Sequence, residues 1–484
     1  MHPGDAVYDY VVVDAGNVGA LPAHRLAVAR HTFALVEAAV SKDADLDSEI
    51  GNSNVSQIPA NGLCFMGKDP NETNSQPIDW NSVTSSRNSI LPYSMKEQRF
   101  TLPNKDLRFV KSMPEYDLAT LDRPGPVDVS FPTMSTDSFA SWAVQVFQEL
   151  SLATMRGFSS GQLPTDQLRA SYKTICLNLL STHAKQIIST DNSTAARGVR
   201  VGAEGLKYMP SARNQVIVSA GAFKALQLLM VSGIGPASSL ERHNIPICRT
   251  EPAAAPQDHV LASPSYRVKV ITGSSIAVPS HRAQAQSPFN ARPPRGPLTN
   301  PGVDTLCKSR SPTAPISPRR LKKSTLPFPP TGRRSSTSPS TGPLATRGNY
   351  AQGPDEGYNC VAMGSALVAL LSRGGVDIAS TDTEDSPVID PRWFSHPGDF
   401  EVAIAAFRRS REIYPRLGVQ SDDEIVELLR NASNTVHDAC CTAAMGQGLR
   451  VSNLPVVDAS IMPFLTPGHP ISLLRGLAER IADA

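Results

Sequence analysis

The chain has little cysteine for its length and no long hydrophobic run. Its 484 residues include seven cysteines that form no CxxC or CxH pattern, so neither a disulfide framework nor a metal site is indicated. No apolar run approaches the roughly 18 residues that a membrane-spanning helix needs. The N-terminus also lacks the basic and then apolar segments of a secretion signal. We therefore expect no metal, no membrane span and a cytoplasmic location as written, with secretion left open if the N-terminus is incomplete.

Net charge is also almost absent. The chain has 46 Lys and Arg against 44 Asp and Glu, a formal charge of +2 that does not indicate a nucleic-acid partner. This average hides one basic stretch: residues 281–350 hold twelve Lys and Arg and one acid, Asp304, so the remainder of the chain sums to −9. The same stretch contains thirteen of the 41 prolines. Because residues 308–347 lack apolar periodicity, we expect a disordered basic, proline-rich insert there.

The first forty residues have the order of a dinucleotide-binding unit. The β-branched run at residues 8–13 predicts a buried strand, residues 20–30 predict a helix, and residues 32–36 predict a second strand. Gly16 and Gly19 lie in the turn between the first strand and the helix. Glycines at such a turn let the backbone approach a pyrophosphate, and the helix N-terminus offers amide hydrogens to it.

Two acidic residues modify this interpretation. Glu37 ends the second strand about twenty residues after the glycines, where an acid can bind a ribose hydroxyl pair. Asp14 occupies the place of the first glycine of the fingerprint, where its side chain crowds the turn and adds a negative charge near the phosphates. The sequence at this point leaves two alternatives open, namely nucleotide binding or a plain strand–helix–strand unit with a glycine turn.

Two further segments make the assignment more specific. Residues 214–218 predict a strand that enters the small-residue turn Ser219–Ala222, followed by a helix and by Ser232–Pro236. The chain closes with residues 456–463, a Pro-Gly-His-Pro turn and the amphipathic helix 471–484. Taken with the N-terminal unit, these segments resemble the glucose-methanol-choline (GMC) flavin oxidoreductases, and most closely their fungal aryl-alcohol and secondary-metabolite branch.

The resemblance implies an α/β and α+β fold in two domains. A Rossmann-like FAD-binding domain is expected beside a substrate domain that is built on an antiparallel sheet backed by helices. In chain order, the expected segments are 1–78 (FAD-binding, first part), 79–195 (substrate, first part), 196–265 (FAD-binding, second part), 266–430 (substrate, second part, including the insert 308–347) and 431–484 (catalytic and FAD-contacting motifs).

The resemblance also implies FAD as the cofactor and a set of residues that bind it. The turn after the first strand would face the pyrophosphate, Glu37 the adenosine ribose, and the third segment the flavin side of the cofactor. The alternative for each is an ordinary turn or strand-end residue. The implied cofactor-binding residues are Gly16, Asn17, Gly19, Glu37, Asp458 and Ala459.

For catalysis the family uses a pair of residues near the C-terminus. His469 matches the second member, and because Pro470 is a natural first helical residue, His469 lies at a helix N-terminus that disfavours its protonated form. A neutral imidazole there can accept a proton near neutral pH, whereas the alternative is a capping or packing role. The first member of the pair falls on Asp438, with His437 one residue earlier. Either His437 serves, or Asp438 replaces it as the base, or the site has lost redox activity.

Several segments that the family places against FAD are absent or shortened here. The family segment expected between residues 78–81 and 90–93 is missing, and residues 446–454 form a short connection. Residues 252–256 read Pro-Ala-Ala-Ala-Pro where the family has glycines and an asparagine. We take these gaps as a hypothesis of mis-joined coding segments or of a decaying paralogue.

The resulting expectation is a FAD-dependent alcohol oxidase or dehydrogenase. It would pass a hydride from a small-molecule primary alcohol, aromatic or polyketide-derived, to flavin N5. The alternative is a non-redox dehydrating cyclase of the same fold, or an inactive truncated paralogue. No nucleic-acid partner is expected, and the oligomeric state is left open.

Overall fold

The computed structural model describes most of the N-terminal unit, the central segments and the C-terminal third of the 484-residue chain. The described residues are 6–16, 18–38, 98–103, 106, 127–130, 167–170, 177–179, 182–189, 195–203, 205–252, 255–262, 265–269, 272, 275, 278–291, 295–296, 298, 307–310, 333–340, 359–413, 421–436, 438–444, 451–466 and 470–482.

The first of two large sheets contains the strands that the sequence predicts for nucleotide binding. Its order is β6–β2–β1–β10–β8–β7, with β9 pairing β8. Strands β6, β2, β1 and β10 run parallel, while β8 is antiparallel to β10, β7 and β9. The strands are β1 (Val7–Val13), β2 (Phe33–Val36), β6 (Leu177–Leu179), β7 (His183–Ser189), β8 (Ala196–Ala203), β9 (Leu206–Tyr208) and β10 (Ser211–Val218).

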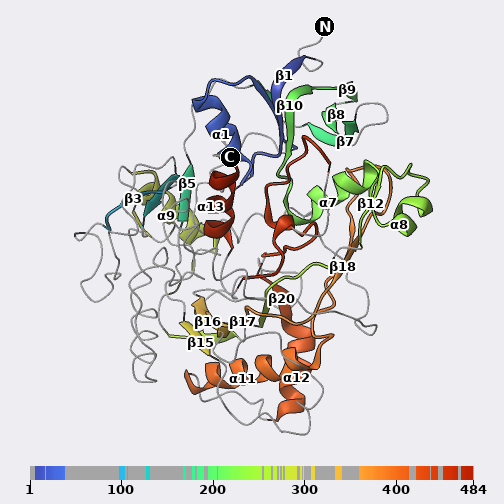
Figure 1. Ribbon diagram of the computed structural model, residues 1–484. Coiled ribbons are helices and arrows are strands. Elements are labelled where there is room, and N and C mark those ends of the chain that lie inside the picture. Colours follow the sequence, from blue (N-terminus) through green and yellow to red (C-terminus); the bar gives the residue numbers. More distant parts are fainter. Residues whose placement is uncertain are drawn as a thin grey trace.

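Strand β1 forms the middle of this sheet because both of its faces are apolar. Val11 and Val12 are fully buried and point to opposite faces, as alternation along a strand requires. Helices α1 (Ala20–Val28) and α13 (Ile471–Ala482) lie side by side on the Val12 face, and α7 (Gly221–Val231) packs on the other (Figure 1). The N-terminal strand and the C-terminal helix therefore share one core.

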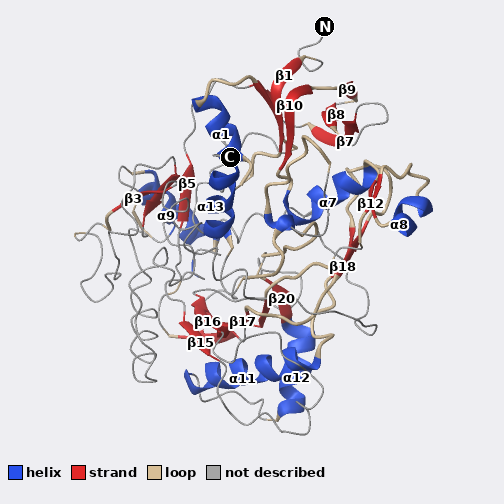
Figure 2. Ribbon diagram, viewed as in Figure 1, coloured by secondary structure: helices blue, strands red, loops and turns tan. Residues whose placement is uncertain are grey.

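The second large sheet is antiparallel and is backed by helices, as expected (Figure 2). Its order is β15–β16–β17–β13–β20, and β14 also pairs β17. Helices α11 (Pro397–Ile413) and α12 (Asp422–Ala432) cover it through a core centred on the buried Phe407 and Ile425. The strands are β13 (Val260–Ala262), β14 (Ser265–Val268), β15 (Cys307–Arg310), β16 (Arg333–Ser340), β17 (Asn359–Leu367) and β20 (Ser433–Thr435).

Smaller elements complete the described part of the chain. Three short sheets are β3–β4–β5 (Gln98–Thr101, Val127–Ser130, Gln167–Ala170), β11–β12 (Ile234–Gly235, Arg249–Thr250) and β18–β19 (Gly375–Asp377, Val388–Asp390). The remaining helices are α8 (Ala237–Arg242), α9 (Pro279–Asn290) and the 3₁₀ turn η6 (Ala459–Ile461).

Part of the proline-rich stretch differs from the expectation of an unstructured insert. Strands β15 and β16 lie within or at the edge of residues 308–347 and join the second sheet through β17. A strand can be held by backbone hydrogen bonds to its neighbour even when its own side chains are small and polar. Residues 311–332 lie outside the described residues. Strands β6 and β7, from the segment 79–195, join the first sheet, and the five-segment division stays a prediction.

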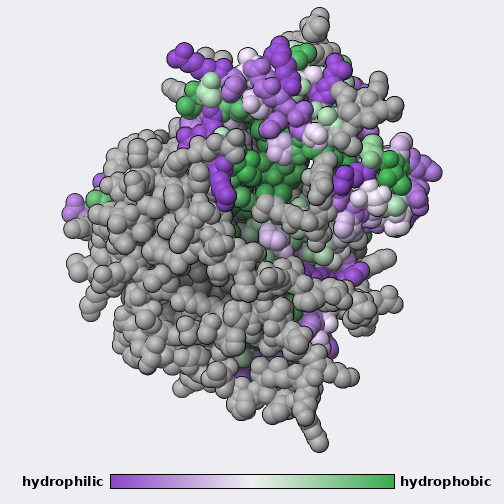
Figure 3. All heavy atoms as spheres, in the orientation of Figure 1, coloured by the Kyte–Doolittle hydropathy of each residue, from purple (hydrophilic) through white to green (hydrophobic). Residues whose placement is uncertain are grey.

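The described surface is mixed in polarity. Figure 3 shows hydrophilic residues over the outer end of the first sheet and hydrophobic residues gathered further inside. Within the described residues, no helix has both the length and the apolar composition to cross a membrane.

Candidate active site

The carboxyl ends of three parallel strands meet at one edge of the first sheet. The Asp14 amide donates to the carbonyl of Val36 at 2.7 Å, and the Ser219 amide donates to the carbonyl of Val13 at 2.9 Å. The C-terminal segment joins this edge because the Val457 amide donates to the carbonyl of Val218 at 2.8 Å. Ligands of open parallel sheets bind at such an edge. The three segments singled out by the sequence therefore converge at these strand ends, which we call the nucleotide edge.

Carboxylates of the chain itself accept hydrogen bonds from the amides of the turn after β1. The Gly16 amide donates to Asp14 Oδ1 at 2.5 Å, and the Ala15 amide donates to Glu37 Oε2 at 2.8 Å. Asp14 has φ of 77°, a left-handed conformation that favours glycine and costs other residues roughly 1 kcal/mol. Gly19 is required, since a Cβ there would lie 2.1 Å from the Asp14 carbonyl oxygen. Asn17 lies outside the described residues.

The carboxyl of Asp14 is electrostatically unfavourable in its charged form. Burial raises its pKa to about 7, and the neighbouring carboxylates of Glu37 and Asp458 push it in the same direction. The hydrogen bond from the Gly16 amide opposes this rise. Two further carboxyl groups thus act on Asp14 at the sheet edge where an anionic pyrophosphate would bind.

Asp458 links the third segment to the second. Its Oδ2 accepts from the Gly221 amide at 3.0 Å, at the start of α7, and its Oδ1 accepts from the Ser460 amide at 2.8 Å. Burial raises the pKa of Asp458, while these hydrogen bonds lower it. The adjacent Ala459 accepts from the Cys441 amide at 3.1 Å through its carbonyl. Both residues therefore hold the C-terminal segment in place at the nucleotide edge.

A second group of polar residues lies where the two sheets meet. His259 is fully buried, with Nδ1 2.8 Å from Asp438 Oδ2 and Nε2 3.1 Å from the carbonyl oxygen of Thr466. Since a carbonyl can only accept, Nε2 carries a proton. The contact with Asp438 therefore holds one further shared proton, on Nδ1 or on the carboxyl. Both ring nitrogens of His259 therefore have hydrogen-bond partners within the protein.

Asp258 adds a third titratable group to this cluster. Burial raises its pKa to about 7, and the Asp438 carboxylate acts in the same direction, whereas the Thr435 hydroxyl bond lowers it. The Thr435 hydroxyl donates to Asp258 Oδ2 at 2.5 Å, and the Asp438 amide donates to Oδ1 at 3.1 Å. The cluster can therefore hold or release a proton near neutral pH.

Gln257 fixes the same segment to two others. Its side-chain amide donates to the Leu370 carbonyl at 2.7 Å, and its Oε1 accepts from the Leu465 amide at 2.8 Å. Its backbone pairs with Cys440 in both directions. We call residues 257–259 the polar clamp, because they join the segments 436–440 and 464–466.

The polar clamp gives Asp438 a partner that the sequence did not predict. Asp438 is placed against His259, a contact that joins positions 179 residues apart. The position of Asp438 near the C-terminus made it a candidate base, but nothing in the sequence indicated that its carboxyl lies against His259. The predicted catalytic residues His437 and His469 lie outside the described residues, so their roles stay predictions.

Comparison with known proteins identifies the family. Models described as GMC oxidoreductase match residues 165–250 and 371–478. "Oxidoreductase cicC" of Emericella nidulans is 45% identical, over 100% of this chain and 94% of its own length. "Patulin synthase" of Aspergillus clavatus is 32% identical, over 99% of this chain and 92% of its own length. The chain belongs to the GMC oxidoreductase family.

Solved structures agree with this fold. A formate oxidase of Aspergillus oryzae superposes with a TM-score of 0.84 at 18% identity, covering 99% of this chain and 98% of its own. A fungal aryl-alcohol oxidase superposes with a TM-score of 0.73 at 20% identity, covering 98% of both chains. GMC oxidoreductases are FAD-binding flavoproteins, which confirms the cofactor expected from the sequence.

This GMC oxidoreductase lacks internal residues that its relative cicC has. The alignment with cicC extends over 586 positions, whereas the chain has 484 residues, which leaves about 102 positions (586 − 484) without a counterpart here. At the described nucleotide edge, the close approach at Gly19 fits a dinucleotide-binding turn, and the Asp14 carboxylate on the Gly16 amide is the group that does not.

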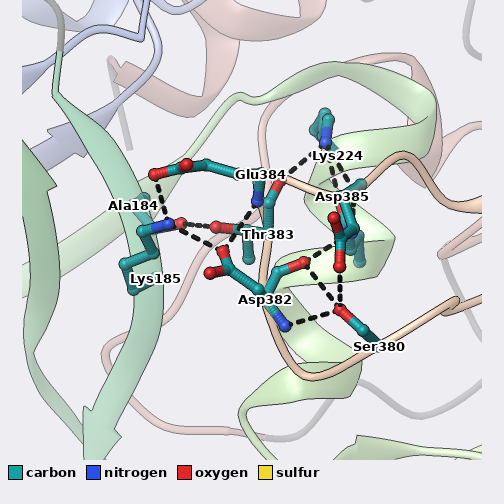
Figure 4. Close-up of polar contacts among 9 residues, drawn as sticks. Ala184, Lys185, Lys224, Ser380, Asp382, Thr383, Glu384 and Asp385 are labelled. Carbon is teal, nitrogen blue, oxygen red and sulfur yellow. Dashed lines mark hydrogen bonds and ion pairs between the residues drawn. The ribbon is translucent and has the colours of Figure 1, made fainter.

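Helix α7, which begins at this edge, is also held by a neighbouring loop (Figure 4). Lys224 donates to the carbonyl oxygens of Thr383 at 2.7 Å and Asp385 at 3.3 Å. Lys185 of β7 pairs with Asp382 at 2.7 Å and with Glu384 at 2.5 Å. The loop between β18 and β19 is thereby tied to both α7 and the first sheet, away from the nucleotide edge.

Proposed function

We propose that this chain is a FAD-dependent oxidoreductase that oxidises the CH–OH group of a small alcohol. The observation that supports it most directly is the path of residues 438–443. Asp438 contacts the polar clamp, while the amides of Cys441 and Ala443 donate to the carbonyls of Ala459 and Ser460, at 3.1 and 2.8 Å, beside the nucleotide edge. One short segment therefore connects the buried His259–Asp438 pair to the nucleotide edge.

Each partner has a separate task in this proposal. When bound, FAD supplies the acceptor for the hydride of the alcohol carbon. The chain supplies the base for the hydroxyl proton, and we assign that task to His469, with His437 as its partner. Asp438 is the weaker candidate for a base because its carboxyl is buried and already paired with the imidazole of His259 at 2.8 Å. Gly16, Asn17, Gly19, Glu37, Asp458 and Ala459 remain the proposed cofactor residues.

An aromatic or polyketide-derived alcohol is the proposed substrate class. Support comes from the sequence likeness to fungal proteins named for secondary metabolites, such as patulin synthase at 32% identity. The family resemblance implies that the substrate domain forms the walls of the substrate pocket. A panel of benzylic and aliphatic alcohols distinguishes this class from others.

The test follows the visible absorption of bound flavin after anaerobic mixing with each alcohol. His469→Ala is expected to slow flavin reduction by a factor of about 10² or more, as loss of a general base does. The matched control is His243→Ala, a histidine at the end of α8, which is expected to reduce flavin at the parental rate. Equal rates in the His469 variant and the parent would overturn the assignment of His469.

A second candidate function is a dehydrating ring closure without net redox change. The polar clamp favours it, because burial raises the pKa of Asp258 to about 7, so that this carboxyl can take up or release a proton beside the buried His259–Asp438 pair without any cofactor. "Versicolorin B synthase" of Aspergillus parasiticus is 30% identical over 81% of this chain. Flavin that stays oxidised with every alcohol, in a protein that still converts a hydroxylated ketone to a cyclic product, would favour this candidate.

A further inference from the structure

We propose that Asp14 acts as an internal anion at the pyrophosphate site, so that the chain binds FAD tightly only when the Asp14 carboxyl has taken up a proton. The inference rests on the proposed function in one respect, namely that FAD is the cofactor of this chain. It makes flavin occupancy dependent on pH and assigns that dependence to one residue.

The hydrogen bonds of the turn after β1 show that its amides already have acceptors. The amides of Ala15 and Gly16 are the donors that follow β1, at the position where a dinucleotide-binding turn presents amides to phosphate. Both are taken by carboxylates of the chain itself, Glu37 Oε2 at 2.8 Å and Asp14 Oδ1 at 2.5 Å. A Cβ on Gly16 would lie 2.8 Å from Asp14 Oδ1, which shows how closely this carboxylate covers the turn.

The charges around the turn carry the second step. Titratable groups that act on Asp14 are Glu37, at the end of β2, and Asp458, ahead of η6, and both are acidic. Adding a pyrophosphate would bring further negative charge to a site with three carboxyl groups. Among the influences on the Asp14 carboxyl, only the Gly16 amide favours its charged form. A phosphate that binds this amide must displace the carboxylate, and neutral Asp14 is easier to displace than charged Asp14.

The direction of the pH effect follows from this competition. Burial and the neighbouring carboxylates raise the pKa of Asp14 to about 7, so protonation occurs within the physiological range. If the protonated form binds FAD, affinity is highest below pH 7 and falls as the pH rises through it. The expected loss is about tenfold between about pH 6 and about pH 8.

A simpler view treats Asp14 as a turn residue that caps Gly16 and has no effect on the ligand. Its φ of 77° shows that the backbone conformation at this position favours glycine, so an aspartate is conformationally unfavourable here. The two views differ in one respect that can be measured. A capping role predicts that removing the charge leaves FAD affinity unchanged or lowers it.

The experiment titrates FAD into the deflavinated full-length chain and follows flavin fluorescence at several pH values. Asp14→Asn keeps the size and an acceptor oxygen but removes the charge, and Asp14→Gly also relieves the backbone. Both variants are expected to bind FAD about tenfold more tightly than the parent at about pH 8, with little dependence on pH. At about pH 6 the parent and Asp14→Asn are expected to agree within about twofold.

The matched control is Asp9→Asn, which removes a carboxylate near the opposite end of the same strand, where Asp9 bonds to Thr32. It is expected to keep the parental affinity and pH dependence. Thermal melting checks that each variant is folded. Equal FAD affinity of parent and Asp14 variants at about pH 8, or a parental affinity that does not change with pH, overturns the inference. Reduction of bound flavin by alcohol is scored separately, so failure here leaves the proposed function standing.

Discussion

The nucleotide edge and the His259–Asp438 pair accommodate charge in opposite ways. At the nucleotide edge, Asp14, Glu37 and Asp458 place like charges together, and burial raises the pKa of Asp14 to about 7. In the polar clamp, the carboxyl of Asp438 meets the imidazole of His259 at 2.8 Å, and the second ring nitrogen also has a partner. The first arrangement becomes favourable only with a proton or an external partner, whereas the His259–Asp438 pair is complete by itself.

This contrast separates a site for binding from a site for holding structure. Buried charges are tolerated when they are paired and hydrogen-bonded, as in the polar clamp. Clustered like charges are common where a protein binds a ligand. We therefore expect mutations in the polar clamp to act on stability first, and mutations at the nucleotide edge to act on FAD affinity first.

The largest effect is expected from breaking the His259 pair. His259→Leu leaves the carboxyl of Asp438 buried without its partner, and such a loss destabilises by about 3–5 kcal/mol. Urea unfolding of the full chain measures this change. Asp438→Asn is the milder companion, because an amide still offers a polar atom to the ring, and about 1–2 kcal/mol is expected. Losses below about 0.5 kcal/mol in both variants would contradict the structural role of the polar clamp.

Gly19→Ala tests the nucleotide edge, the other region in this comparison. A Cβ at Gly19 would lie 2.1 Å from the backbone oxygen of Asp14 and 2.9 Å from Ser219 Cβ, so the turn must move. The expected cost is about 1–3 kcal/mol, together with weaker FAD binding. Gly202→Ala is the control, since its Cβ would meet only the flexible Lys185 side chain within 3.4 Å, at 3.2 Å. A Gly19 variant as stable as the control would mean that the close approach is not essential.

The smallest effect is expected at the brace of α7. Lys185→Ala removes ion pairs to Asp382 and Glu384, whose side chains are 54% and 57% exposed, so less than about 1 kcal/mol is expected. Added salt should reduce that difference further. Lys224→Ala is its partner experiment, because this lysine donates to backbone carbonyls and is expected to cost more, about 1–2 kcal/mol. A reversed order in thermal melting would show that the exposed pairs matter more than the backbone contacts.

Much of the first sheet could be predicted from local sequence. The run Val11–Val13 is apolar on both faces, and such a run fits a central parallel strand whatever the rest of the chain does. The order of strand, glycine turn, helix and acid then places Gly19 and Glu37 within one short unit. Local patterns of this kind are complete within about 30 residues, which is why they can be recognised without a structure.

Contacts between distant segments could not be predicted in this way. His259 and Asp438 are 179 residues apart, and no periodicity connects them. The negative charge of Asp14 was visible in the sequence, but the bond of its carboxylate to the Gly16 amide was not. The strand β16 was missed because its partner β17 supplies the backbone hydrogen bonds that its own polar side chains do not suggest.

The most direct test of the proposed function is one visible absorption spectrum of the purified full-length chain with FAD, recorded before and after anaerobic addition of an aryl alcohol. The proposed function predicts flavin bands that are present at the start and bleach when the alcohol is added. Bound flavin that stays oxidised with every alcohol in the panel would contradict it.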